Sequence, residues 1–213
     1  MEEKENVALD TVPKIFWNAV NTRKNKTAMR EKDLGIWQSI SWREYGDKAK
    51  YVGLALNSLG LDKGDVVSIA SEGIPEWLFT DLGVICVGGI SSGVYTTDSS
   101  SQVEYLVNDS KTNFYFAENE EQLDKILEVR ENCPSLKKII IYDLEGLHDF
   151  SDPQVISFSE LIKLGESIDK NNPDLFESLM AKVSPEDIAI LVYTSGTTGP
   201  SKGAMISNKN MLQ

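Results

Sequence analysis

The sequence predicts an α/β protein in which a mostly parallel β-sheet is layered with helices. Apolar runs of four or five residues, typical of strands in such a sheet, alternate with longer segments of helical periodicity. Two of the helical segments open on capping boxes, and glycine-rich turns separate helices from strands. With 213 residues, of which 41% are hydrophobic, the chain is long enough to bury a sizeable core.

The first predicted elements are a helix and a hairpin. Residues from Thr11 to about Lys24 have one apolar face and a proline in the first turn, which predicts the opening helix. Two short strands are predicted around Ala28–Glu31 and Ile36–Ile40, because the Asp-Leu-Gly sequence between them suits a hairpin turn.

A capping box opens the second helix. The Ser41 side chain can accept a hydrogen bond from the Glu44 amide while the Glu44 side chain reaches back to Ser41. Gly60 suits the position just after the helix end, where a left-handed backbone is needed. The apolar face predicted for this helix consists of Tyr45, Ala49, Val52, Leu56 and Leu59.

Strands and helices then alternate along the chain, which argues for a parallel sheet covered on both faces. The predicted strands are Val66–Ala70, Ile90–Val94, Asn113–Ala117, Lys138–Ile141 and Ile188–Val192. The predicted helices are residues 75 to about 87, a helix that begins at a capping box of Ser99 and Gln102, and Glu121–Asn132. From Asp143 to about Lys182 the pattern weakens, and we expect a looser excursion with two short helices.

Composition narrows the classes of protein that the chain can be. The formal net charge of −12 argues against a protein that coats nucleic acid and equally disfavours electrostatic attachment to anionic membranes. No apolar run approaches the roughly 20 residues of a spanning helix, and the acidic N-terminus is unlike a secretory signal. Cys86 and Cys133 are too few for a disulfide scaffold or a zinc site, so we expect buried or half-buried free thiols in a reducing cytoplasm.

The stretch "YTSGTTGPSKG", residues 193–203, concentrates the polar chemistry of the chain. It follows the run Ile188–Val192, which we expect to be a strand buried on both faces. Glycine-rich loops at the carboxyl end of such strands bind ligands in open α/β sheets, because glycine lets backbone amides approach closely. The hydroxyl side chains and Lys202 add donors and a positive charge, which favours a polyphosphate ligand. A Ser/Gly-rich surface loop without a ligand is the alternative.

This stretch differs from the ordinary nucleotide-binding P-loop. That motif needs a glycine, four further residues and then Gly-Lys-Ser/Thr. Here Ser201 stands where the second glycine belongs, and Gly203 follows Lys202. The hydroxyl that would hold magnesium is therefore missing from the loop.

"YTSGTTGPSKGAMISNKN" resembles the signature phosphate-binding loop of the adenylate-forming superfamily, which includes acyl-CoA synthetases, luciferases and peptide-synthetase adenylation domains. The stretch from Ile40 to Ser110 resembles the N-terminal region of the long-chain fatty acyl-CoA ligase branch. Within it, "PEW" at residues 75–77 and "GVYTT" at residues 93–97 are more similar to long-chain and bubblegum-type synthetases than to ligases of small acids.

The resemblance implies a two-step reaction. The carboxylate of a fatty acid attacks the α-phosphate of ATP, bound with Mg²⁺, to give an acyl-adenylate and pyrophosphate, and the thiol of CoA then displaces AMP. Because a carboxylate and a polyphosphate repel each other, such an enzyme must position both and neutralise charge. The resemblance assigns no catalytic residue and no metal ligand to this chain. The residues that it places around the β- and γ-phosphates are Thr194, Ser195, Gly196, Thr197, Thr198, Gly199 and Lys202.

By the same resemblance, residues 1–213 are an incomplete N-terminal AMP-binding domain that ends just after the phosphate loop, with the C-terminal lid absent. In the family the adenine pocket, the magnesium-holding acid and the catalytic lysine of the lid follow this loop, so we expect the chain alone to be inactive. The parent enzyme is expected in the cytoplasm, with peripheral membrane contact left open. Two alternatives remain: a stand-alone phosphate- or nucleotide-binding module, and a non-catalytic interaction domain of the same fold.

Other residues that could carry chemistry have plainer interpretations. His148, the one histidine, is expected at the surface rather than as an acid/base catalyst. The acids of Glu118–Glu121 are expected in solvent at the start of a helix rather than on a metal. The four tryptophans fall on apolar faces and are expected to pack in the core: Trp17, Trp37, Trp42 and Trp77.

Overall fold

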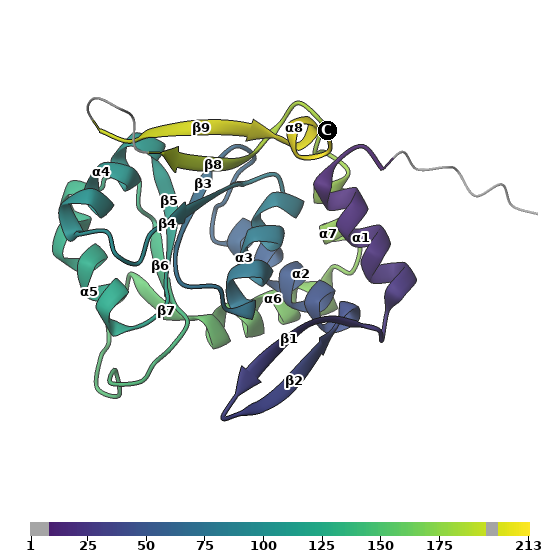
Figure 1. The fold of residues 1–213 in the computed structure, drawn as a ribbon, viewed down its shortest axis with the longest axis horizontal. Helices are drawn as coiled ribbons and strands as arrows, with labels where there is room; N and C mark the ends of the chain where they lie inside the picture. Colours follow the sequence, from purple (N-terminus) through teal and green to yellow (C-terminus); the bar gives the residue numbers. More distant parts are fainter. Residues whose placement is uncertain (1–8, 195–199) are drawn as a thin grey trace, which may run out of the picture.

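The computed structural model of the protein describes residues 9–194 and 200–213, and its centre is a seven-stranded sheet of order β7-β6-β5-β3-β4-β8-β9 (Figure 1). Every neighbouring pair from β7 to β8 is parallel, and β8–β9 is antiparallel. The mostly parallel α/β class predicted from the sequence is therefore confirmed. The strands of this sheet are β3 (Val66–Ala70), β4 (Ile90–Val94), β5 (Thr112–Ala117), β6 (Lys138–Ile141), β7 (Val155–Ser157), β8 (Ile188–Thr194) and β9 (Lys202–Ser207).

Helices cover the two faces of the sheet. Helices α1, α2, α3, α6 and α7 pack on one face, and α4 and α5 lie on the other (Figure 1). A 3-10 turn at Arg130–Asn132 extends α5. The helices are α1 (Val12–Arg23), α2 (Trp42–Ser58), α3 (Pro75–Cys86), α4 (Ser100–Ser110), α5 (Glu120–Val129), α6 (Phe158–Asn171), α7 (Leu175–Met180) and α8 (Asn208–Met211).

The central strands supply side chains to both layers of the core. In β5, Phe114 and Phe116 pack among the residues of α2, α3 and α6, while Tyr115 and Ala117 pack against α4 and α5. All four side chains are fully buried. This is the continuous apolar pattern of a strand buried on both faces, and each large side chain buried in this way contributes roughly 1.5–3 kcal/mol.

Local signals in the sequence set many of the element ends. The capping boxes at Ser41 and at Ser99 are both formed, with the serine side chain accepting from the third amide of the helix. Gly60 follows α2 with φ of +95°, a conformation that glycine adopts without strain. The predicted hairpin is formed by β1 (Thr27–Asp33) and β2 (Ile36–Ser41), and its turn residues Leu34 and Gly35 both have positive φ.

The region from residue 143 to 182 is more regular than predicted. A three-residue strand, β7, adds to the edge of the sheet beside β6, and a third capping box, formed by Ser157 and Glu160, opens α6. Helix α6 has 14 residues, so it is not one of two short helices. It packs closely on α2, where a Cβ on Gly165 would stand 2.0 Å from the Tyr51 carbonyl oxygen. The close approach of the two backbones requires glycine here.

Two predictions about apolar burial were wrong. Strand β8 is not buried on both faces: Val192 is 39% exposed, because β8 pairs with β4 over only two residues and its other neighbour is the outermost strand β9. Trp37 is 63% exposed on the hairpin instead of packing in the core. Trp17, Trp42 and Trp77 are partly buried against the larger core cluster, and the thiols of both cysteines are free and buried as expected.

Candidate functional site

The base of the predicted phosphate loop is a β-hairpin. Strand β8 ends at Thr194 and β9 begins at Lys202, and these two residues are partners in the antiparallel register. Lys202 is thus the first residue of a strand and not part of the loop, which corrects the sequence-based placement. Both side chains are exposed, and partners in such a register stand about 4.5–5.5 Å apart at Cα. The structure therefore brings Thr194 and Lys202 together.

The other predicted site residues lie outside the described part of the chain. These residues are Ser195, Gly196, Thr197, Thr198 and Gly199.

Gly203 is needed for the way the hairpin closes. It is the register partner of Tyr193, and a Cβ built on it would stand 3.1 Å from Tyr193 Cζ. A side chain there would push against the buried tyrosine ring, which is 7% exposed. Packing against Tyr193 therefore requires glycine at position 203, whether or not Gly203 also contacts a ligand.

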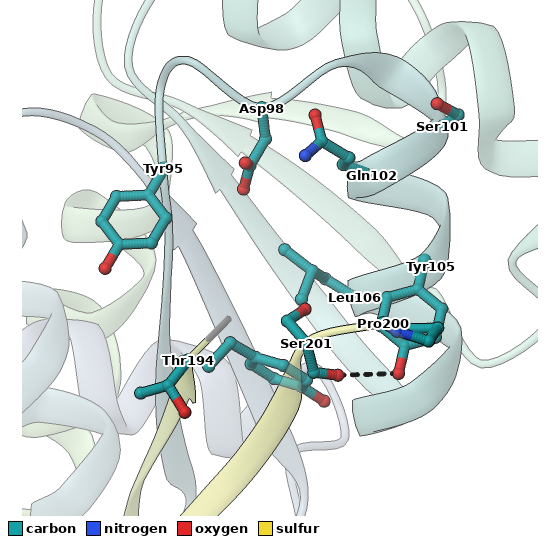
Figure 2. Close-up of a pocket in the computed structure, with 10 residues that line it drawn as sticks. Tyr95, Asp98, Ser101, Gln102, Tyr105, Leu106, Thr194, Pro200 and Ser201 are labelled. Carbon is teal, nitrogen blue, oxygen red and sulfur yellow. Dashed lines mark hydrogen bonds between the residues drawn. The ribbon is translucent and has the colours of Figure 1, made fainter. Parts of the chain in front are cut away.

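Helix α4 holds both ends of the loop. Tyr193 on β8 donates its hydroxyl hydrogen to Asp109 Oδ2 at 2.8 Å. Tyr105 donates to the backbone oxygen of Ser201 at 2.8 Å, as Figure 2 shows. Tyr105 and Asp109 are four residues apart and so lie on one side of the helix. One helix face therefore fixes the position where the loop leaves the sheet and the position where it returns.

The hydroxyl of Tyr193 is a neutral donor over the physiological range. Burial of the ring raises its pKa well above the ordinary value, and the hydrogen bond to the Asp109 carboxylate raises it further, because a phenolate beside a carboxylate would be repelled. A neutral donor to an ionised acceptor makes a stronger hydrogen bond than a neutral pair does.

A cavity of about 630 Å³ opens between α4 and the base of the loop. Figure 2 shows Asp98 and Gln102 on one side of it and Thr194 and Ser201 on the other, with Tyr95 at its edge. Burial raises the pKa of Asp98, the one acid in the lining. No Lys or Arg among the described residues lines the cavity. Lys125, on α5, is the cation close enough to Asp98 to lower its pKa in part, and Lys202 follows the lining residue Ser201 in the chain. The lining residues are Tyr95, Asp98, Ser101, Gln102, Tyr105, Leu106, Tyr193, Thr194, Pro200 and Ser201.

A hydrogen-bond network fixes the loops at the carboxyl edge of the sheet. The Thr96 carbonyl, in the loop after β4, accepts from Gln122 Nε2 at 3.2 Å and from Lys125 Nζ at 2.7 Å, both on α5. The Thr96 hydroxyl donates to Glu72, and the Glu72 amide donates to Glu118. Glu118 is half-buried in this network rather than in solvent as expected. The loops that follow β3, β4 and β5 are thereby tied to one another.

A second, apolar cavity of about 400 Å³ lies on the α3 side of β4 and β8. Trp77 and Val192 line it, and Tyr95 and Tyr193 line both cavities, so the two cavities are adjacent. Gly93 leaves this space open, since a Cβ on it would only just reach Trp77 at 4.0 Å. The two segments compared with long-chain synthetases, residues 75–77 and 93–97, thus meet at one cavity.

The one histidine has the surface position expected of it. His148 is exposed in a turn. Within residues 9–194 and 200–213, no group of three His, Cys, Asp or Glu side chains is arranged to hold a metal ion.

Sequence reasoning missed the residues that hold the loop. The i, i+4 spacing of Tyr105 and Asp109 indicates that both side chains lie on one face of a helix, and this much can be predicted from the sequence. Their partners Ser201 and Tyr193 are 96 and 84 residues away, and no local pattern connects them. Gln122 and Lys125 are common residues for the surface of a helix, and nothing in the sequence indicates that both donate to the Thr96 carbonyl.

The fold and the loop define a class of enzyme. Residues 16–213 match the family model described as AMP-binding enzyme, and the chain belongs to this family. The fold and function class expected from the loop sequence are thereby confirmed at the level of the family.

Among curated proteins the chain is similar to long-chain-fatty-acid–CoA ligases of the ACSBG1 and ACSBG2 types. It is 32% identical to ACSBG1 of Rattus norvegicus over 201 residues, which are 94% of this chain and 27% of the relative. It is 34% identical to ACSBG2 of Gallus gallus over 203 residues, 94% of this chain and 26% of the relative. The chain thus spans about a quarter of the length of these proteins.

Among solved structures, the anthranilate CoA ligase AuaEII in complex with anthranoyl-AMP superposes with a TM-score of 0.78 at 27% identity, over 93% of this chain and 35% of that one. The luciferase-like enzyme from the nonluminescent Zophobas morio mealworm gives a TM-score of 0.77 at 18% identity, over 95% of this chain and 44% of that one, and shows the fold alone. The likeness of both structures confirms the fold class.

Proposed function

We propose that this chain is the N-terminal portion of an ATP-dependent fatty acid–CoA ligase, and that residues 194–199 with Lys202 hold the β- and γ-phosphates of ATP. The observation that carries the proposal is the hairpin register, which sets Thr194 and Lys202 side by side at the carboxyl end of β8. Helix α4 holds Tyr193 and Ser201, so a phosphate group bound there would meet a hydroxyl and an ammonium group that arise from fixed backbone positions.

The proposed reaction follows the two steps implied by the family resemblance. ATP and a fatty acid give an acyl-adenylate and pyrophosphate, and CoA then takes the acyl group and releases AMP. The Lys202 ammonium would stabilise the charge that develops on pyrophosphate as it leaves. Mg²⁺ would be held largely by the phosphate oxygens of ATP, because this ion usually takes only one or two carboxylates from the protein.

The decisive experiment replaces Lys202 in the full-length protein that contains this chain. A charge-assisted hydrogen bond is worth about 1.5–3 kcal/mol, so Lys202→Ala should slow fatty-acid-dependent ATP–pyrophosphate exchange roughly 10- to 150-fold. Thioester formation from supplied acyl-adenylate should stay within about two-fold of the wild-type rate, because pyrophosphate has already left by that step. Lys209→Ala is the matched control, since it removes an exposed lysine from α8, just beyond the same hairpin.

Equal loss in both half-reactions, or equal loss in the Lys209→Ala control, would reject the phosphate assignment. A panel of acids tests the substrate class: we expect medium-to-long fatty acids to exceed acetate and benzoate in kcat/KM. The 213-residue chain by itself is expected to catalyse neither step. Nucleotide binding without catalysis in the full-length protein would instead favour the stand-alone binding module, and tight binding to a protein without any nucleotide binding would favour the interaction domain.

We also propose the cytoplasm as the compartment of the protein. Its free, buried thiols Cys86 and Cys133 fit a reducing compartment. Among the described residues, none of the helices has the length and apolar character needed to span a bilayer.

A further inference from the structure

The β1–β2 hairpin exposes apolar side chains at its tip. It extends from the body of the molecule at the edge opposite β8 and β9 (Figure 1). Leu34, in the turn, is 96% exposed, Ile36 is 65% exposed and Trp37 is 63% exposed. Three large apolar side chains together on a projecting turn are unusual for a surface in water, where such residues occur singly.

The base of the hairpin is anchored, so the exposure of the tip is a property of a fixed element. Met29 and Ile40 pack against the core cluster of α1 and α2. The Trp42 amide donates to the Lys26 carbonyl at 3.0 Å, which closes the base where β2 runs into α2. The tip is therefore held away from the core by a packed and hydrogen-bonded base.

The register of the hairpin separates its charges onto two faces. Lys32 pairs with Trp37 and Arg30 pairs with Ser39, so both cations lie on the face that carries the tryptophan. Asp33 pairs with Ile36, and Glu31 lies two residues before Asp33, so both acids lie on the opposite face. Within the described residues neither Arg30 nor Lys32 forms an ion pair. One face thus presents a tryptophan and two unpaired cations beside an apolar turn.

The hairpin region is basic in an acidic chain. Residues 23–43 hold six of the 21 Lys and Arg residues but only two of the 33 Asp and Glu residues. Charges separated by more than about 8–10 Å are largely screened at physiological ionic strength. The net charge of −12 therefore does not decide what the tip meets, because most of that charge lies further away than this. Near the tip Arg30 and Lys32 balance Glu31 and Asp33, so the positive charge belongs to the face that carries Trp37 and not to the tip as a whole.

We propose that the β1–β2 hairpin is a membrane-docking element, which inserts its tip into the interface of an anionic lipid bilayer. Leu34, in the turn, enters the boundary between headgroups and acyl chains, and Trp37, on the cationic face, lies at the headgroup level, where its amphipathic ring is favoured. Ile36 lies on the opposite face, beside Asp33. Lys32 is next to the tip and Arg30 is about 7 Å further along the strand, so both reach the anionic headgroups. The proposal does not depend on nucleotide binding at the other end of the molecule.

Sedimentation of the full-length protein with lipid vesicles tests the proposal. We expect binding to vesicles of equal parts phosphatidylserine and phosphatidylcholine, a decrease with added salt, and little binding to phosphatidylcholine alone. Arg30→Gln/Lys32→Gln should weaken the partition coefficient about 30-fold, since each cation near the surface contributes roughly a five-fold factor. Trp37→Ser should weaken it roughly ten-fold or more, because it removes the largest inserted side chain.

Matched variants distinguish the hairpin from the rest of the surface. Lys170→Gln/Lys182→Gln makes the same change in net charge at exposed sites on and after other helices, and Leu144→Ser removes an exposed apolar side chain elsewhere. Both should bind vesicles as the wild type does. Trp37→Phe keeps an apolar ring and should still bind, while losing most of the fluorescence quenching that brominated lipids cause in the wild type.

The outcomes that overturn the proposal are specific. Absence of vesicle binding would do so, as would binding that the hairpin variants and the control variants weaken equally. A concentration-dependent dimer that Trp37→Ser abolishes, without any vesicle binding, would show that a second copy of the chain covers the tip instead. Unchanged thermal unfolding of each hairpin variant would confirm that the loss of binding does not come from loss of the fold.

Discussion

Removing the hydroxyl of Tyr193 tests how helix α4 holds the base of the loop. The hydroxyl stands 2.8 Å from Asp109 Oδ2, and the residue is only 7% exposed. Tyr193→Phe keeps the ring against Gly203 and deletes one hydrogen bond to an ionised acceptor. Such a bond contributes about 1.5–3 kcal/mol when it is shielded from water. Asp109 is itself exposed, and water can replace the phenol at its carboxylate, so we expect a loss of about 1–1.5 kcal/mol.

Urea denaturation of the 213-residue chain measures this loss directly, and thermal unfolding should show a decrease in Tm of about 2–6 °C for a chain of this size. Tyr105→Phe is the matched control. Its hydroxyl bonds a neutral carbonyl, that of Ser201, from a side chain that is 36% exposed, so we expect a loss of at most about 0.5 kcal/mol.

A double-mutant cycle separates the hydrogen bond from other effects of the substitution. If Tyr193 and Asp109 act as a pair, Tyr193→Phe in an Asp109→Ala background should cost almost nothing further. Additive losses in the cycle, or a Tyr193→Phe protein as stable as the wild type, would refute the inference that this bond stabilises the hairpin against α4.

Two further predictions concern the core. Asp81 is buried in α3, its Oδ1 has no partner among the described residues, and burial raises its pKa to about 6 against a weaker opposing hydrogen bond from Ser91. As the pH rises, the Asp81 carboxyl loses its proton in the unfolded chain before it does so in the folded protein, so the folded protein loses stability relative to the unfolded chain. Between about pH 4 and pH 7 the free energy of unfolding of the wild type should therefore fall by about 3 kcal/mol more than that of Asp81→Asn. Above about pH 7 the two free energies should change with pH in parallel. The Cβ of Gly165→Ala would collide with the Tyr51 carbonyl, so this change should lower the free energy of unfolding by at least about 3 kcal/mol or prevent folding. Gly73→Ala is the control: no atom lies within 4 Å of its Cβ, and it should change the free energy of unfolding by less than about 1 kcal/mol. Similar effects of the two changes would show that α2 and α6 can move apart at little cost in free energy.

The sequence by itself determined the elements whose signals are local. The helix that begins at Ser41 and the one that begins at Ser99 were predictable because a capping box involves residues three apart. The central strands were predictable because burial on both faces demands an apolar run, as in Val66–Ala70. The same capping signal, at Ser157 and Glu160, opens α6. The stretch at residues 193–203 indicated the family, because a motif of contiguous residues can be read directly from the sequence.

The tertiary structure decided everything that depends on partners distant in sequence. An apolar run such as Ile188–Val192 is buried on both faces only at the centre of a sheet, and the sequence does not say that β8 lies next to the edge. Trp37 has the large apolar side chain typical of core residues, but its exposure depends on the direction in which the hairpin extends from the body of the molecule. Lys202 became the partner of Thr194 only through the return of the chain as β9, and the hold of α4 on that hairpin joins residues more than 80 positions apart. Periodicity and capping are interactions within a few residues, whereas strand order, exposure and the geometry of the site arise when distant segments pack, which no local pattern records.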